Sequence, residues 1–122
     1  MSSQVKSYRD LKVWQRSCDL AENVYAITRS FPKHELYGLV SQMRRAAVSV
    51  PSNIAEGAGR QGATEYLRFL SIACGSLAEL RTLVELARRF QYVAAEKADQ
   101  LDTDIDEISK MLYGLRRGLE TK

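Results

Sequence analysis

The spacing that most strongly suggests chemistry is a glycine pattern in the middle of this 122-residue sequence. Residues 57–62 read Gly-Ala-Gly-Arg-Gln-Gly, which matches the G-x-G-x-x-G pattern of dinucleotide-binding loops. Such a loop binds phosphates when a strand precedes it, a helix follows it and an acid lies about 20 residues on. Here a helical pattern precedes the glycines, and Glu79 and Glu85 lie on a helical pattern. We therefore interpret the segment as a helix end and tight turn, where glycine can adopt positive φ.

Few other residues could serve catalysis or metal binding. His34 is the only histidine, and the Glu-x-x-His pairs of di-metal helical bundles are missing from the sequence. We expect His34 to be exposed in the first turn of a second helix. Cys18 and Cys74 stand among apolar residues, which favours small buried side chains in a reducing compartment over a disulfide or metal site. Because no nucleophile–base pair is evident, we predict no catalytic, cofactor-binding or metal-binding residue and no enzyme.

An acidic run is the next candidate for ion binding. Asp102 and Asp106 share a helix face, whereas Asp104 lies at another angle. A divalent ion could bridge the pair, but carboxylates from one helix supply too few ligands. Acids at the start of this segment and bases at its end complement the helix dipole. We interpret the run as a feature that stabilises the helix and not as an ion-binding site.

Arginines are the remaining candidates for a functional surface. Lys and Arg number 18 against 15 Asp and Glu, giving a net charge of +3 and a pI near 9.0, which permits a nucleic-acid partner without requiring one. Arg44, Arg45, Arg60 and Arg68 could line a basic surface for phosphates, and we see no exposed aromatic platform for bases. Arg45 points away from the apolar side of its helix, and is either solvated or in contact with a partner subunit or nucleic acid. The Arg-Arg pairs at 88–89 and 116–117 stand near helix ends, which favours capping.

The patterning predicts an all-α protein, an antiparallel up-down four-helix bundle formed as one domain over residues 1–122. The helices are expected near residues 10–30, 35–57, 63–90 and 94–119. Asp10 is a plausible N-cap, Phe31-Pro32 should end the first helix, and Pro51 should kink the second without dividing it. The third-helix seam has spacings of four and three, and comprises Tyr66, Leu70, Ala73, Leu77, Leu80, Val84 and Ala87.

Two helices carry more apolar surface than one bundle core requires. The segments 10–30 and 63–90 each show about one and a half apolar stripes, and exposed patches of this kind usually mark interfaces. We therefore predict self-association.

No apolar stretch approaches the roughly 20 residues of a membrane helix, and the first residues lack the apolar region of a signal peptide. The expected location is the cytoplasm, with no membrane partner.

Four segments together resemble a known family. Residues 41–57 read SQMRRAAVSVPSNIAEG, and this segment closely resembles the hallmark of the four-helix bundle proteins encoded in 23S rRNA intervening sequences. The third helix, EYLRFLSIACGSLAEL at 65–80, is similar to that family's third helix. YRDLKVWQ at 8–15 and ISKMLYGL at 108–115 resemble its opening and its last helix. Cys74 and Tyr66 stand where the family often has other apolar residues.

The resemblance implies a homopentameric ring of four-helix bundles. Related accessory proteins of diversity-generating retroelements are pentamers with basic surfaces that bind nucleic acid and a reverse transcriptase. We therefore expect a non-catalytic oligomeric scaffold that binds RNA or DNA through arginines such as Arg44, Arg45, Arg60 and Arg68. The alternative is a protein-interaction module whose basic surface docks an acidic protein without nucleic acid.

Overall fold

The computed structural model describes residues 7–121, and nearly all of them are helical. The four long helices are α1 (Lys12–Thr28), α2 (Ser41–Ala58), α3 (Ala63–Arg89) and α4 (Ala95–Glu120). Three short elements accompany them: η1 (Tyr8–Asp10), η2 (Lys33–Glu35) and the π-helix η3 (Leu36–Val40). No strand occurs within residues 7–121, and none of their helices is long and apolar enough to cross a membrane.

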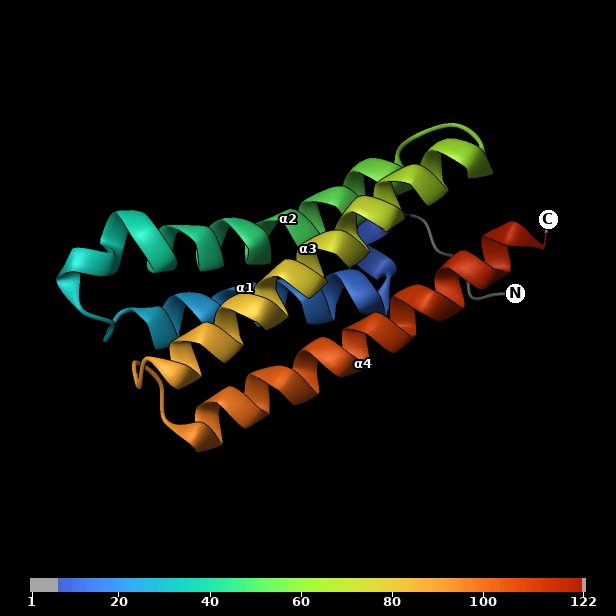
Figure 1. Ribbon diagram of the computed structural model, residues 1–122. Helices are drawn as coiled ribbons and strands as arrows, with labels where there is room; N and C mark the ends of the chain where they lie inside the picture. Colours follow the sequence, from blue (N-terminus) through green and yellow to red (C-terminus); the bar gives the residue numbers. More distant parts are fainter. Residues whose placement is uncertain (1–6, 122) are drawn as a thin grey trace.

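The long helices form a closed bundle. Each packs against its neighbours in the sequence, and α4 returns to pack against α1 (Figure 1). The link from α1 to α2 contains η2 and η3, and the other two links are short turns, so that consecutive helices run antiparallel in up-down order (Figure 1). This architecture confirms the predicted fold class.

The core is formed by the predicted seams. Along α3, the seam from Leu70 to Ala87 is buried at every predicted position, and Leu77 is 2% exposed. In α4, four residues with the same spacing of four and three are also buried: Leu101, Ile105, Ile108 and Leu112. Periodicity of four and three identified these positions because it places residues on one helical face. A second apolar stripe lies beside this seam and comprises Phe69, Ile72, Leu83 and Phe90. In the structure Leu83 is buried, whereas Ile72 and Phe90 are exposed.

The start of α1 differs from the prediction. Asp10 is not its N-cap, because residues 8–10 form the separate turn η1 and Leu11 occupies the cap position. The Ser7 hydroxyl accepts a hydrogen bond from the Arg9 N–H, and the Asp10 carboxylate accepts one from the Ser7 N–H at 3.2 Å. The polar side chains therefore cap the turn that precedes the helix.

Helix α2 runs through Pro51 without being divided, as expected, although proline removes one backbone donor. The predicted start near residue 35 is wrong, because α2 begins at Ser41. A non-helical backbone lies further upstream, at Gly38 in η3, where φ is −111° and ψ is −109°. Leu36, Val40, Met43 and Ala47 are spaced by four and three in the sequence, which predicts one buried seam, but the side chain of Leu36 is 46% exposed. The π-turn accounts for the error, since wider turns change the angle between successive side chains.

The glycine-rich segment is a helix end and turn, as interpreted from the sequence. Gly59 is the C-cap of α2 with a right-handed backbone, and Gly62 precedes α3 with φ of +88°. The positive φ thus occurs at the end of the motif, at the entry to a helix.

Candidate functional site

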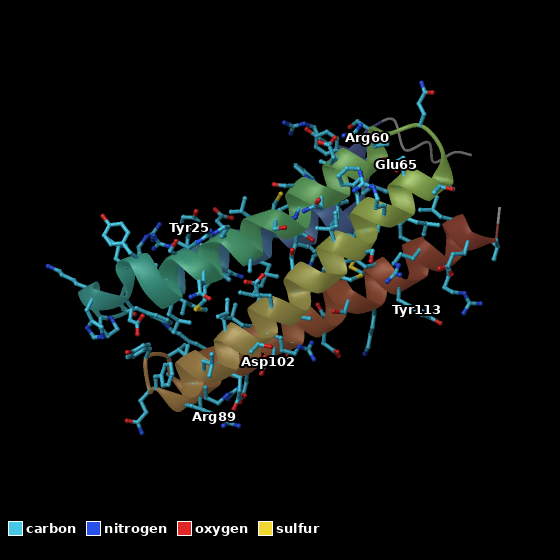
Figure 2. The ribbon with its side chains drawn as sticks, turned by 45° about the horizontal axis from the view of Figure 1, so that its top comes forward. Tyr25, Arg60, Glu65, Arg89, Asp102 and Tyr113 are labelled. Carbon is cyan, nitrogen blue, oxygen red and sulfur yellow. The ribbon has the colours of Figure 1, made fainter. Side chains whose placement is uncertain are left out.

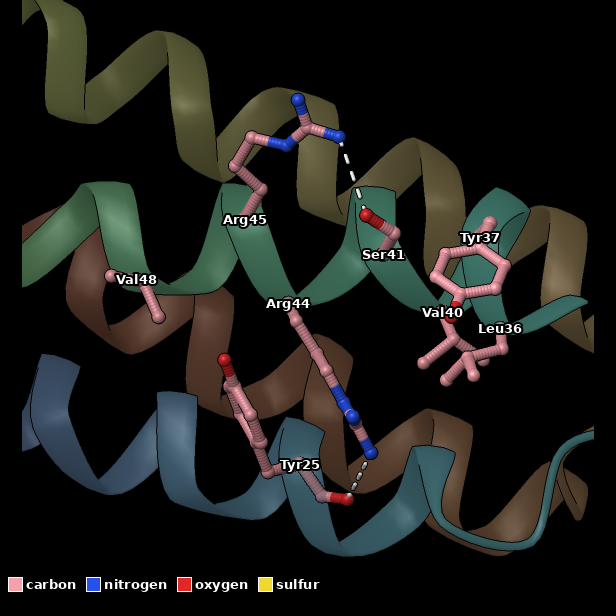
Figure 3. Close-up of a pocket in the computed structure, with 8 residues that line it drawn as sticks. All are labelled: Tyr25, Leu36, Tyr37, Val40, Ser41, Arg44, Arg45 and Val48. Carbon is pink, nitrogen blue, oxygen red and sulfur yellow. Dashed lines mark hydrogen bonds between the residues drawn. The ribbon is translucent and has the colours of Figure 1, made fainter.

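Arg44 extends from α2 to α1. Its Nε donates to the Thr28 hydroxyl at 3.0 Å, and its Nη2 lies 3.4 Å from the Tyr25 carbonyl oxygen. The guanidinium carbon lies 4.5 Å from the centroid of the Tyr25 ring (Figure 3). Thr28 is itself 2% exposed and donates to the Val24 carbonyl at 2.7 Å. Arg44 is therefore fixed by neutral partners and an aromatic face.

Arg45, the next residue, lies on the exposed side of α2. Its Nη2 is 3.4 Å from the Ser41 hydroxyl oxygen, one helical turn earlier. Within residues 7–121, neither Arg44 nor Arg45 forms a salt bridge with a carboxylate. Both positive charges therefore remain available to an external anion.

The two arginines border a groove of about 470 Å³ between α1, η3 and α2. None of the described residues that line it is Asp or Glu. Its large apolar and aromatic side chains include Tyr37, which is 93% exposed, and Val48, which is 42% exposed. We call this feature the Tyr25–Tyr37 groove; it is lined by Tyr25, Leu36, Tyr37, Val40, Ser41, Arg44, Arg45 and Val48.

The irregular entry to α2 builds one wall of this groove. The Glu35 carboxylate accepts a hydrogen bond from the Leu39 N–H at 3.1 Å and another from the Tyr92 hydroxyl at 3.0 Å. The Leu39 bond, followed by the Tyr92 bond, lowers the pKa of Glu35 below its usual range. A Cβ at Gly38 would lie 2.8 Å from Glu35 Oε1, so glycine permits this close approach. The side chain of Glu35 thus holds the π-turn that carries Tyr37.

Arg60 and Arg68 lie around a different aromatic ring, near the link between α2 and α3. Their guanidinium carbons are 5.1 Å and 4.4 Å from the Phe69 centroid. Glu56 pairs with Arg60 at 2.7 Å, and Glu65 pairs with Arg68 at 3.2 Å. The hydrogen bond from Arg68 and its charge lower the pKa of Glu65. We call these five residues the Phe69 cluster; each arginine in it has a carboxylate partner.

The structure therefore does not unite the four predicted arginines in one surface. Arg44 and Arg60 are separated by most of α2, roughly 20–25 Å at 1.5 Å per residue. Figure 2 shows Tyr25, beside Arg44, well apart from Arg60 and Glu65. Arg44 and Arg45 form one group, and Arg60 and Arg68 form another.

The acidic run of α4 binds arginines from α3. Arg88 contacts Asp99 at 2.9 Å and Asp102 at 2.8 Å, and Arg81 lies 3.6 Å from Asp106. Arg88 lies in the last turn of α3, as predicted, but its guanidinium also binds carboxylates of α4 and so bridges the two helices. The hydrogen bond to Asp99 raises the pKa of Arg88. Within residues 7–121, no group of three or more His, Cys, Asp or Glu could hold a metal ion.

The remaining sequence candidates stay apart from the groove. His34 is exposed in η2, outside α2 itself. Cys18 and Cys74 are free thiols and are half-buried, whereas full burial was predicted. Burial raises the pKa of Cys18. Cys74 is reached by Arg116, whose Nη1 lies 3.6 Å from the sulfur, so a long polar side chain covers it on one side.

Sequence reasoning missed the tyrosines of the groove, because it predicted no exposed aromatic platform. Tyr25 is 40% exposed at the edge of the apolar face of α1. Tyr37 stands beside Gly38, and glycine in the first turn of a predicted helix is a signal of broken geometry. That signal, read together with the adjacent tyrosine, could have identified an exposed ring.

Fold and groove together define the class of this chain, a small all-α four-helix bundle with a basic and aromatic surface groove. Within that class it belongs to the 23S rRNA-intervening sequence protein family, whose profile matches residues 9–114. The resemblance noted from the sequence is thereby confirmed.

A solved structure shares the fold. It is the crystal structure of a protein with unknown function from the S23 ribosomal protein family of Bacteroides thetaiotaomicron VPI-5482. The two are 23% identical with a TM-score of 0.77, over 85% of this chain and 97% of the other. No curated protein matches the chain. At this identity the likeness establishes the arrangement of helices and leaves the function to be argued from the site.

Proposed function

We propose that this protein is a non-catalytic, oligomeric bundle of the cytoplasm that binds nucleic acid, RNA or DNA, through the surface bearing Arg44 and Arg45. One observation carries the proposal: both arginines lack a carboxylate partner within residues 7–121 and border a groove without acids. Phosphates bind such guanidiniums by charge-assisted hydrogen bonds and release counterions from the strand.

Arg60 and Arg68 have a smaller part in this proposal than the sequence suggested. Each is already paired with a glutamate on its own helix or at its edge. A phosphate would have to displace that carboxylate, so the net gain in charge interaction is smaller. The Phe69 cluster therefore serves as an internal control for the groove.

Self-association is the second part of the proposal. Ile72, Leu86 and Phe90 are exposed apolar side chains on α3 and at its end. Covering them between copies would remove apolar surface from water, which is the main driving force of protein association. The family resemblance implies a homopentamer, and a ring would repeat Arg44 and Arg45 around one axis. Multi-angle light scattering measures this directly, and a monomeric mass would contradict it.

A protein partner is the second candidate function. Leu36 and Val48 give the groove exposed apolar surface, which favours an acidic protein segment with apolar anchors. A pull-down with and without nuclease separates the candidates. Partners retained after nuclease treatment support the protein-interaction module, whereas their loss supports nucleic acid.

The direct test is a titration of labelled RNA at several salt concentrations. We expect Arg45→Ala to weaken binding and to reduce the salt slope by about 0.7–0.9, the value for one phosphate contact. Arg68→Ala is the matched control, because it also removes one exposed arginine but one with a carboxylate partner. Equal effects of the two variants, or binding without salt dependence, would contradict the proposal.

A further inference from the structure

The Tyr25–Tyr37 groove contains two features that phosphate binding alone does not require. The first is Tyr37, whose ring is 93% exposed although burial normally stabilises an aromatic side chain. The second is Tyr25, 40% exposed, with the Arg44 guanidinium over its ring. Figure 3 shows Arg44 crossing the groove between Tyr25 on one side and Tyr37, Leu36 and Val40 on the other.

The local backbone holds Tyr37 in this position. It lies in a π-turn that is fixed by the Glu35 carboxylate through Leu39 and Tyr92. π-Helical turns are rare and occur frequently at functional sites. A regular helix would have placed Leu36 on the core seam, as the periodicity predicted. The exposed ring is thus the product of a specific irregularity, and a surface that used only arginines would not need it.

Exposed tyrosines beside arginines distinguish between forms of nucleic acid. The bases of a single strand offer their faces for stacking on aromatic rings, and stacking is tolerant of sequence. In a duplex the faces are already stacked, so a protein side chain reaches only groove edges and phosphates. A groove that combines rings with unpaired guanidiniums therefore gains most from a single strand.

We propose that the Tyr25–Tyr37 groove binds single-stranded nucleic acid, with bases stacked on Tyr37 and Tyr25 and phosphates bound by Arg44 and Arg45. The inference rests on the proposed function and specifies its ligand. Charge complementarity favours this occupant over a second copy of the chain. Among residues 7–121, the groove carries two positive charges without a carboxylate partner and is lined by no acid, which suits a polyanion. This chain, in contrast, has 15 acids and 18 bases of its own.

The test compares a labelled single strand of roughly 12 uridines, within the usual site sizes, with a duplex RNA of the same length by fluorescence anisotropy. We expect the wild-type protein to bind the single strand more tightly. Tyr37→Ala should weaken single-strand binding by about fivefold or more and change duplex binding little. Tyr37→Phe should bind as the wild type does, because it retains the ring.

Tyr113→Ala is the matched control. Tyr113 is also an exposed tyrosine, at 61%, and has the Arg117 guanidinium 5.8 Å from its ring centroid, but it lies on α4 outside the groove. We expect this variant to bind the single strand as the wild type does. An equal loss in Tyr113→Ala would overturn the inference, because any exposed tyrosine would then suffice.

Two further outcomes separate this inference from the proposed function. Salt-sensitive binding with equal affinity for both RNAs, or an equal loss for both in Tyr37→Ala, would overturn single-strand selection and leave the nucleic-acid proposal standing. Absence of binding to either RNA at low salt would overturn both. A change in the mass of the protein assembly caused by Tyr37→Ala would assign the groove to a second copy and overturn the inference.

Discussion

Two regions of this bundle place arginines over aromatic rings, yet they differ in what else is present. In the Tyr25–Tyr37 groove, Arg44 lies over Tyr25 and is held by a hydroxyl and a carbonyl. In the Phe69 cluster, Arg60 and Arg68 lie over one ring and each has a glutamate. An arginine without a carboxylate partner is the better candidate for anion binding, because an incoming anion need not displace a carboxylate.

The largest expected effect comes from overpacking the contact between α2 and Phe69. An added Cβ at Gly57 would lie 2.9 Å from Phe69 Cβ and 3.2 Å from the Tyr66 carbonyl oxygen. Gly57→Ala should therefore lose roughly 1 kcal/mol of unfolding free energy, since overpacking outweighs the gain of about 1 kcal/mol in helix propensity. Urea denaturation measures the change.

Gly114→Ala is the control for this prediction. It also replaces a helical glycine, but nothing lies within 4 Å of the added Cβ. We expect this variant to gain up to about 1 kcal/mol. If both variants were stabilised alike, the close contact of α2 with Phe69 would be wrong. RNA binding at the groove should not change in either.

The sequence predicts best those features that depend on residues three or four positions apart. The buried seams of α3 and α4 follow from spacing alone, because burial repeats with the helical period. The pairing of Arg60 with Glu56 and of Arg68 with Glu65 was also within reach, since the spacings of four and three are helical neighbours. Treating the four arginines as one set overlooked those carboxylates.

Contacts between segments that are distant in the sequence could not be predicted from residue spacing. Arg88 was assigned to a helix end, yet its partners Asp99 and Asp102 come from the next helix. In the same way, the position of Tyr37 depends on a hydrogen bond to Glu35 from Tyr92, which lies in the link between α3 and α4. Such contacts arise only when distant segments pack together, so a periodic pattern could place the helices and not these side chains.

A smaller effect is expected from removing the carboxylate partners of both arginines in the Phe69 cluster. Glu56→Gln with Glu65→Gln removes both carboxylates and raises the formal net charge from +3 to +5, since 18 bases then face 13 acids. We expect single-strand RNA to bind a few-fold more tightly, with a salt slope steeper by up to about 0.7 for each new phosphate contact. Anisotropy at several salt concentrations measures both quantities.

The control for this gain is Glu96→Gln with Glu120→Gln. These two residues are exposed on α4 and form no salt bridge within residues 7–121, so their replacement changes the net charge equally without releasing an arginine. A gain of the same size in the control would show that overall charge, and not a released guanidinium, governs binding.

The smallest expected effect concerns two carboxylates, Glu35 beside the groove and Glu65 in the Phe69 cluster. Both have a lowered pKa, but the causes differ: hydrogen bonds from the Leu39 N–H and the Tyr92 hydroxyl for Glu35, and the Arg68 guanidinium for Glu65. A lowered folded-state pKa contributes stability that is present above the unfolded value, about 4.3, and is lost as pH falls through the folded value.

Salt distinguishes the two causes. In urea denaturation, the difference between wild type and Glu35→Gln should be largest near neutral pH and should shrink as the pH falls below about 4. The same holds for Glu65→Gln, but about 1 M NaCl should erase much of that difference at neutral pH because an exposed ion pair is screened. Neutral donors bind the Glu35 carboxylate, so the difference in unfolding free energy between wild type and Glu35→Gln should persist in salt. If salt removed both differences equally, charge and not hydrogen bonding would hold the π-turn, and the two regions would share one mechanism.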